Sequence, residues 1–197
     1  MLNDQFHSVF TKEDHTNFPD KEPSPYPTMK NINISTEGVY KLLKNQSTSP
    51  QAYRPRRDTS SYHQSRASQL EPILARIYQH TLDHGEISKD WRYALVVPIF
   101  KKGERHIAAN HRPVSLTSIS CKILEHIIHS NIMKHFDTNK ILTDTQHGFR
   151  KKRSTESQLL ITVQEIVKRL ATESHVDIIL LDFVKSFDKV PHSRLMH

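Results

Sequence analysis

The chain is poor in the residues on which several protein classes depend. Among its 197 residues there are four glycines and one cysteine, Cys121. No G-x-G-x-x-G or P-loop pattern occurs, which argues against a glycine-rich nucleotide-binding loop. A single cysteine excludes an intramolecular disulfide and argues against a secreted disulfide scaffold. Apolar residues surround Cys121 at helical spacing, so we interpret it as a small buried helix residue rather than a reactive thiol.

Long apolar runs are also lacking. The longest, Ala94 to Phe100, is interrupted by Pro98 and is far shorter than the roughly 20 residues that cross a bilayer. The first residues have neither the basic region nor the apolar region of a signal peptide. We therefore expect an intracellular protein, in the cytoplasm or the nucleus, with no membrane partner.

What the chain does have is positive charge, unevenly spread. Lys and Arg number 28 against 21 Asp and Glu, a formal net charge of +7. Residues 1–30 hold five acidic residues and three lysines, so the remaining residues carry +9. Basic residues cluster in Lys101–Arg105 and in Arg150–Arg153. Such density favours a polyanionic partner, most often nucleic acid, and a solvated, solubilising turn is the alternative.

Composition divides the chain near residue 67. Four prolines fall between residues 19 and 27, and residues 45–66 are polar with almost no apolar periodicity; both features favour irregular backbone. We expect residues 1–67 to form a largely irregular connector, interrupted by a short helix over 35–44 that Ser35 caps. Residues 68–197 form the predicted domain.

Helical periodicity recurs three times in that domain. The first predicted helix begins with a Ser68–Glu71 capping box and ends at Gly85. The second covers 119–136. The third begins with a Thr155–Gln158 capping box. Its apolar residues define a predicted inner face, made of Leu159, Leu160, Val163, Ile166, Val167 and Leu170.

Two segments read as strands, which makes the predicted fold class α+β. Residues 94–100 form a strand that Pro98 confines to a sheet edge. Residues 176–182 are rich in β-branched and apolar side chains, so we expect a central strand covered on both faces.

Asp182 ends that predicted central strand. A buried carboxylate needs a partner or a metal ion, and strand ends commonly hold Mg²⁺ for phosphoryl chemistry. The residues alone favour a cap of the next turn slightly over a metal ligand. For Asp188 they favour a local cap, or a pair with Lys185 or Lys189, over a metal role.

Several blocks, in order along the chain, resemble the reverse transcriptase of LINE-type, jockey-like non-LTR retrotransposons. Each block alone is a weak signal, and five in register are a strong one. The resemblance runs from about Gln69 to His192. The blocks are Gly85–Trp91, Val97–Gly103, Asn110–Ser118 (Asn-His-Arg-Pro-Val-Ser-Leu-Thr-Ser), Gln146–Arg150 (Gln-His-Gly-Phe-Arg) and Leu181–His192 (Leu-Asp-Phe-Val-Lys-Ser-Phe-Asp-Lys-Val-Pro-His).

The resemblance implies an incomplete right-hand polymerase fold, of which this chain holds the fingers and the first palm strand. Asp182 matches the family's first metal-binding aspartate, and the Phe183 backbone carbonyl would lie beside the metal ions. Phe187 matches the aromatic gate that favours deoxynucleotides by excluding a ribose 2′-hydroxyl. The implied cofactor is Mg²⁺, and the implied partners are an RNA template, a DNA primer and dNTPs.

The same resemblance assigns the basic residues. Lys101 and Arg112 would hold the incoming triphosphate, with Lys102 as the substitute for Lys101. The block that follows the template strand contributes Gln146, Gly148 and Arg150, where salt-sensitive backbone contacts are expected.

The sequence also departs from the family. His111 and Ser186 stand where Tyr and Ala are usual, and Arg54 stands where a turn glycine is expected. The aromatic-x-Asp-Asp turn that carries the other metal-binding aspartates is not among these residues. One aspartate cannot hold two metal ions, so we expect a polymerase fragment that is inactive alone. A non-catalytic nucleic-acid binder and a product without function or stable fold are the alternatives, which leaves open whether this chain is an enzyme.

Overall fold

The structure is a computed structural model that describes residues 2–12, 18, 20–45, 63–173 and 175–196. It combines helices with strands, which confirms the mixed α and β content. The chain divides into two compact units. The first consists of Met1–Val9 and Thr28–His135, and the second of Phe10–Pro27 and Phe136–His197. No helix in the described part of the chain is long and apolar enough to cross a membrane.

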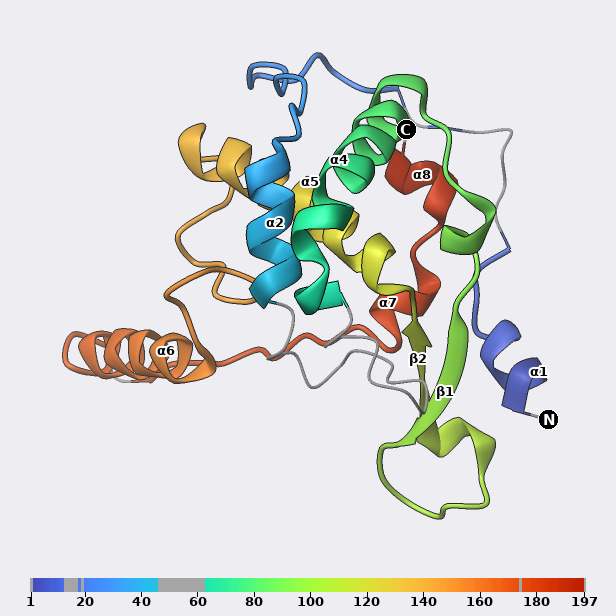
Figure 1. Cartoon of the computed structure of the whole chain (residues 1–197). Coiled ribbons are helices and arrows are strands. Elements are labelled where there is room, and N and C mark those ends of the chain that lie inside the picture. Colours follow the sequence, from blue (N-terminus) through green and yellow to red (C-terminus); the bar gives the residue numbers. More distant parts are fainter. Residues whose placement is uncertain (1, 13–17, 19, 46–62, 174, 197) are drawn as a thin grey trace. The chain divides into compact units, whose positions relative to one another are not determined.

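Three helices build the core of the first unit (Figure 1). Helix α2 (Thr36–Asn45) lies against α4 (Ala67–His84), and the N-terminal part of α5 (Ile119–Thr138) completes the core. Residues 36–45 therefore share a core with residues beyond the predicted connector. The buried residues are Val39, Leu43, Ala67, Ala75, Tyr78, Ile123 and Leu124.

The helix ends test the predicted caps. Ser35 does cap α2, because its hydroxyl accepts a hydrogen bond from the Gly38 N–H at 3.1 Å. Gly85 ends α4 in the left-handed conformation, at φ 69°, which glycine adopts without strain. The Ser68 capping box is wrong, because α4 begins at Ala67 and Ser68 already lies inside its first turn.

The only sheet among the described residues is the antiparallel hairpin of β1 (Leu95–Phe100) and β2 (His111–Leu116). The strand predicted over 94–100 is confirmed, whereas β2 was not predicted. The register sets Pro98 opposite Pro113. In a two-stranded sheet each strand is an edge, so both prolines occupy the position that their missing N–H allows.

The second unit contains α6 (Thr155–Leu170), α7 (Ser186–Lys189) and α8 (His192–Met196). Helix α6 has a capping box, but Ser154 and Ser157 form it instead of Thr155 and Gln158. The predicted inner face of α6 is wrong for this structure: Leu160 is 71% exposed, and α6 has no buried residue.

The predicted central strand over 176–182 is also wrong for this structure. These residues have no strand assignment, and they run as an extended trace between α6 and α7 (Figure 1). Leu180 and Leu181 are 91% and 89% exposed. A strand requires a hydrogen-bonded neighbour, and among the described residues only β1 and β2 pair. The remaining elements are α1 (Leu2–His7), η2 (Lys89–Trp91) and η3 (Ala108–Asn110).

Candidate functional site

The β1–β2 hairpin brings Lys101 and Arg112 to one face. Arg112 is paired with Ile99, and beyond the last strand residue the Lys101 N–H donates to the Asn110 carbonyl at 2.8 Å. Cross-strand partners point to the same side of a sheet, as do residues two apart. Lys101 and Arg112 are therefore diagonal neighbours on one face, and both are exposed. A point charge beside a planar guanidinium suits a phosphate chain.

A glycine shapes the loop that joins the two strands. Gly103 has φ 86°, and a Cβ atom added there would lie 2.6 Å from the Asn110 Nδ2 atom. That amide in turn donates to the Glu104 carbonyl at 3.0 Å. The Arg105 guanidinium lies 5.2 Å from the centre of the Phe100 ring. These contacts hold the turn that follows Lys101.

The segment carrying Asp182 is open to solvent. Asp182 is exposed rather than buried at a strand end, and Phe183 is 82% exposed, so the premise of a buried carboxylate is wrong for this structure. The part of the chain that the structure describes has no group of three or more His, Cys, Asp or Glu side chains suited to a metal ion. Asp182 therefore does not belong to a group of three or more such side chains among the described residues.

Two exposed aromatic rings connect the Gln146–Arg150 block with the Asp182 segment. The Phe149 and Phe187 ring centroids are 6.1 Å apart and nearly perpendicular, at 81°, an edge-to-face geometry that aromatic pairs favour. The exposed fractions are 84% for Phe149 and 77% for Phe187. The predicted nucleotide gate, Phe187, thus lies beside the predicted template block.

Within that block, the side chain of Arg150 is engaged by its own protein. Its guanidinium donates to the Thr143 carbonyl at 2.9 Å and lies 3.6 Å from a carboxylate oxygen of Asp137. The side chain is only 16% exposed. Gln146 and Gly148 are exposed, and the Gln146 amide makes a long contact, 3.5 Å, to the Gly148 carbonyl.

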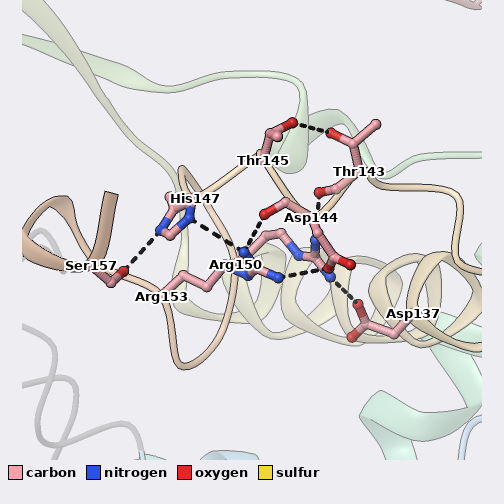
Figure 2. Close-up of polar contacts among 8 residues, drawn as sticks. All are labelled: Asp137, Thr143, Asp144, Thr145, His147, Arg150, Arg153 and Ser157. Carbon is pink, nitrogen blue, oxygen red and sulfur yellow. Dashed lines mark hydrogen bonds and ion pairs between the residues drawn. The ribbon is translucent and has the colours of Figure 1, made fainter. Parts of the chain in front are cut away.

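Arg153 forms a second internal contact set (Figure 2). Its guanidinium pairs with the Asp144 carboxylate at 2.8 Å and donates to the Asp144 carbonyl. Another guanidinium contact, 3.4 Å long, reaches Nε2 of His147, whose ring is buried. His147 Nδ1 lies 2.8 Å from the Ser157 hydroxyl, so this set joins the loop to the N-terminus of α6.

The partners determine the tautomer of His147. A guanidinium only donates hydrogen bonds, so Nε2 accepts from Arg153 and Nδ1 carries the proton. Nδ1–H then donates to the Ser157 hydroxyl, which itself donates to the Ser154 carbonyl at 2.9 Å. Sequence reasoning missed this set, because its members lie three to thirteen residues apart without any periodic pattern.

Cys121 has the buried environment that its helical surroundings predict. Burial is the main cause that raises the pKa of its thiol from 9.0 to about 11, and the neighbouring Glu125 carboxylate adds to the effect. The Glu125 carboxylate accepts a hydrogen bond from the thiol at 3.5 Å. A raised pKa keeps the thiol protonated and unreactive.

Comparison with known proteins gives a consistent result. Residues 99–197 match the family described as reverse transcriptase (RNA-dependent DNA polymerase). Three proteins of Drosophila melanogaster are similar over 52–64% of this chain. The RNA-directed DNA polymerase from mobile element jockey is 30% identical over 126 residues, and the probable RNA-directed DNA polymerase from transposon BS is 29% identical over 124 residues. The probable RNA-directed DNA polymerase from transposon X-element is 28% identical over 103 residues. The aligned segments span 11–14% of the length of these relatives.

Proposed function

Because the chain belongs to the reverse transcriptase (RNA-dependent DNA polymerase) family, we propose that it is the fingers and the first palm segment of a non-LTR retrotransposon polymerase with a right-hand fold. In its intact form this polymerase adds dNTPs to a DNA primer on an RNA template. The observation that carries the proposal is the shared face of Lys101 and Arg112 on the β1–β2 hairpin, an arrangement that suits the negative charge of a triphosphate. The chain acts inside the cell, where RNA and dNTPs are available.

In this proposal each unit contributes different groups. Lys101 and Arg112 hold the triphosphate, with Lys102 as a substitute cation, while Phe187 lies under the sugar and excludes a 2′-hydroxyl. Gln146, Gly148 and Arg150 belong to the loop that faces the template.

The reverse transcriptase family uses divalent metal ions such as Mg²⁺, and the donor chemistry of this chain fits them in part. Asp182 and the Phe183 carbonyl are hard oxygen donors, which Mg²⁺ prefers. The described residues contain no group of three or more His, Cys, Asp or Glu side chains suited to a metal ion, and positioning two metal ions requires several carboxylates. In the proposal Asp182 is one ligand of the metal pair in the intact polymerase, and this chain alone is inactive.

A second candidate function is non-catalytic binding of nucleic acid. It is favoured by the exposed Lys151 and Lys152 next to the predicted template block. The two functions differ in the role of Asp182, which matters for polymerisation and not for binding.

Primer extension tests the proposal. The chain would replace the corresponding segment of the full-length jockey polymerase, and the chimera would be compared with variants Asp182→Asn, Lys101→Gln and Arg112→Gln. We expect Asp182→Asn to abolish extension. The two cation variants should each raise the KM for dNTPs at least tenfold, because each removes a charged phosphate contact worth about 1.5–3 kcal/mol.

Lys168→Gln is the control, since Lys168 is an exposed cation on α6, outside the proposed site, and should leave extension unchanged. Extension that survives Asp182→Asn would contradict the proposal, and so would extension by the isolated 197-residue chain. An unchanged KM in both cation variants would show that the hairpin does not bind the triphosphate.

A further inference from the structure

The basic run Arg150–Arg153 is divided by the structure into two kinds of cation. The two arginines at its ends are turned into the protein: their side chains are 16% and 24% exposed. The two lysines between them are exposed. Four cations that look equivalent in the sequence therefore differ in what they can reach.

The arginines already have acidic and carbonyl partners. Arg150 binds the Thr143 carbonyl and the Asp137 carboxylate. Arg153 binds Asp144 at both its carboxylate and its carbonyl. A guanidinium that moved to a phosphate would leave these groups without their partners, at a cost that offsets the new contact.

The lysines are in the opposite situation. Within the described part of the chain neither lysine forms an ion pair, so both charges are available. Lys152 has φ 61°, a conformation that a residue with a side chain holds only when its surroundings impose it. The two engaged arginines provide that constraint, since one lies on each side of the lysine pair.

A nearby acid does not neutralise this pair. Glu156 lies in the first turn of α6, where a hydrogen bond from the Ser154 hydroxyl lowers its pKa. Its carboxylate is thus engaged at the helix N-terminus, where negative charge is favourable. The outward charge of the loop remains that of the two lysines.

We propose that Lys151 and Lys152 are the contacts of this loop with the phosphodiester backbone of single-stranded nucleic acid, and that Arg150 and Arg153 are structural residues that hold the loop. The inference rests on the proposed function, because it concerns the template-facing loop. It differs from the family-based expectation, which assigns template contact to Arg150. Lysine is a point charge with little directional demand, which suits contacts to a backbone independent of sequence.

The test measures how binding depends on salt. Fluorescence anisotropy of a labelled single-stranded RNA 20-mer would follow binding by the 197-residue chain and its variants between 50 and 300 mM salt. The double variant Lys151→Gln/Lys152→Gln removes two phosphate contacts. The negative slope of log K, the association constant, against log salt should become shallower by about 1.4. The affinity at 100 mM salt should fall about 25-fold. The melting temperature of this variant should be unchanged, because both side chains are exposed.

Two comparisons make the result specific. The double variant Lys134→Gln/Lys168→Gln removes the same charge from exposed helix positions and should keep the slope. Arg150→Gln and Arg153→Gln should lower the melting temperature and also keep the slope. With the Lys151/Lys152 variant, the salt slope measured on a DNA 20-mer of the same sequence should decrease by the same amount as on RNA, because the phosphates are common to both.

The outcomes separate this inference from the proposed polymerase function. A slope that falls in the arginine variants but not in the lysine variant would overturn it. So would an equal fall in the charge-matched control, a fall on RNA alone, or no salt-dependent binding by the unmodified chain. Each of these results leaves the dependence of primer extension on Asp182 untouched, so the two proposals fail separately.

Discussion

His147 offers the most direct test of how the loop that contains Arg150 and Arg153 is held on α6. The residue is 8% exposed, Nδ1 contacts the Ser157 hydroxyl at 2.8 Å and Nε2 contacts Arg153 at 3.4 Å. His147→Ala removes both contacts and leaves a space where the ring was. One good hydrogen bond is worth about 1 kcal/mol, and the lost ring packing adds a similar amount. The first turn of α6 should therefore be destabilised by about 2 kcal/mol.

Two amide variants separate the contacts. The side-chain amide of Asn lies close to the position of Nδ1, and the amide of Gln lies close to that of Nε2. Because the Nδ1 contact is the shorter one, His147→Asn should retain more stability than His147→Gln. Both should be more stable than His147→Ala.

Hydrogen exchange measures the effect locally. The Ser157 N–H donates to the Ser154 hydroxyl and the Gln158 N–H donates to the Ser154 carbonyl, so both amides report on the start of α6. A loss of about 2 kcal/mol corresponds to exchange about 30-fold faster in His147→Ala. If Gln protected these amides better than Asn, the stronger contribution of the Nδ1 contact would be refuted. If Ala left exchange unchanged, the anchoring role of His147 would be refuted.

Two further predictions concern the first unit. Because burial raises the pKa of Cys121 from 9.0 to about 11, the unfolded chain releases the thiol proton more readily, and stability that is complete below pH 9 is lost as the pH rises toward 11. The loss of stability is at most about 3 kcal/mol, at about 1.4 kcal/mol per pH unit. Urea unfolding at pH 8 and pH 11 measures this loss, which should be smaller in Cys121→Ala. An equal loss in that variant would contradict the prediction. Gly103→Ala places a Cβ atom 2.6 Å from the Asn110 amide at φ 86°, so it should destabilise the hairpin by about 1–2 kcal/mol. Faster exchange of the Lys101 amide, which donates to the Asn110 carbonyl, checks that result, and unchanged exchange would count against it.

Local patterns account for the elements that were predicted well. The helices α2, α4 and α5 and the strand β1 follow from apolar periodicity and terminal residues such as Ser35 and Gly85, because these signals act within one or two turns. Two capping boxes were misplaced. At Thr155 the adjacent Ser154 offers a similar starting point and forms the cap instead, whereas α4 begins before Ser68 without any side-chain cap. Boundaries of this kind depend on where the backbone first becomes helical.

The errors concern elements whose state depends on distant partners. Residues 176–182 have the composition of a central strand, but a strand forms only when another strand supplies hydrogen bonds. Helix α6 depends on distant partners in another way: its apolar side becomes buried only where another element packs on it, and α6 has no buried residue. In the opposite direction, β2 contains Pro113 and polar residues, and pairing with β1 makes it a strand nevertheless.

By itself, the amino-acid sequence determined the family, the order of its blocks and the basic and acidic residues that carry the proposed chemistry. It did so because these features depend on residue type and spacing alone. Only the tertiary structure decided that Lys101 and Arg112 share a face, because that follows from the hairpin register. It likewise decided that Arg150 and Arg153 turn inward while the lysines between them face solvent, because the carboxylates and carbonyls that engage the arginines are brought to them by the folded loop.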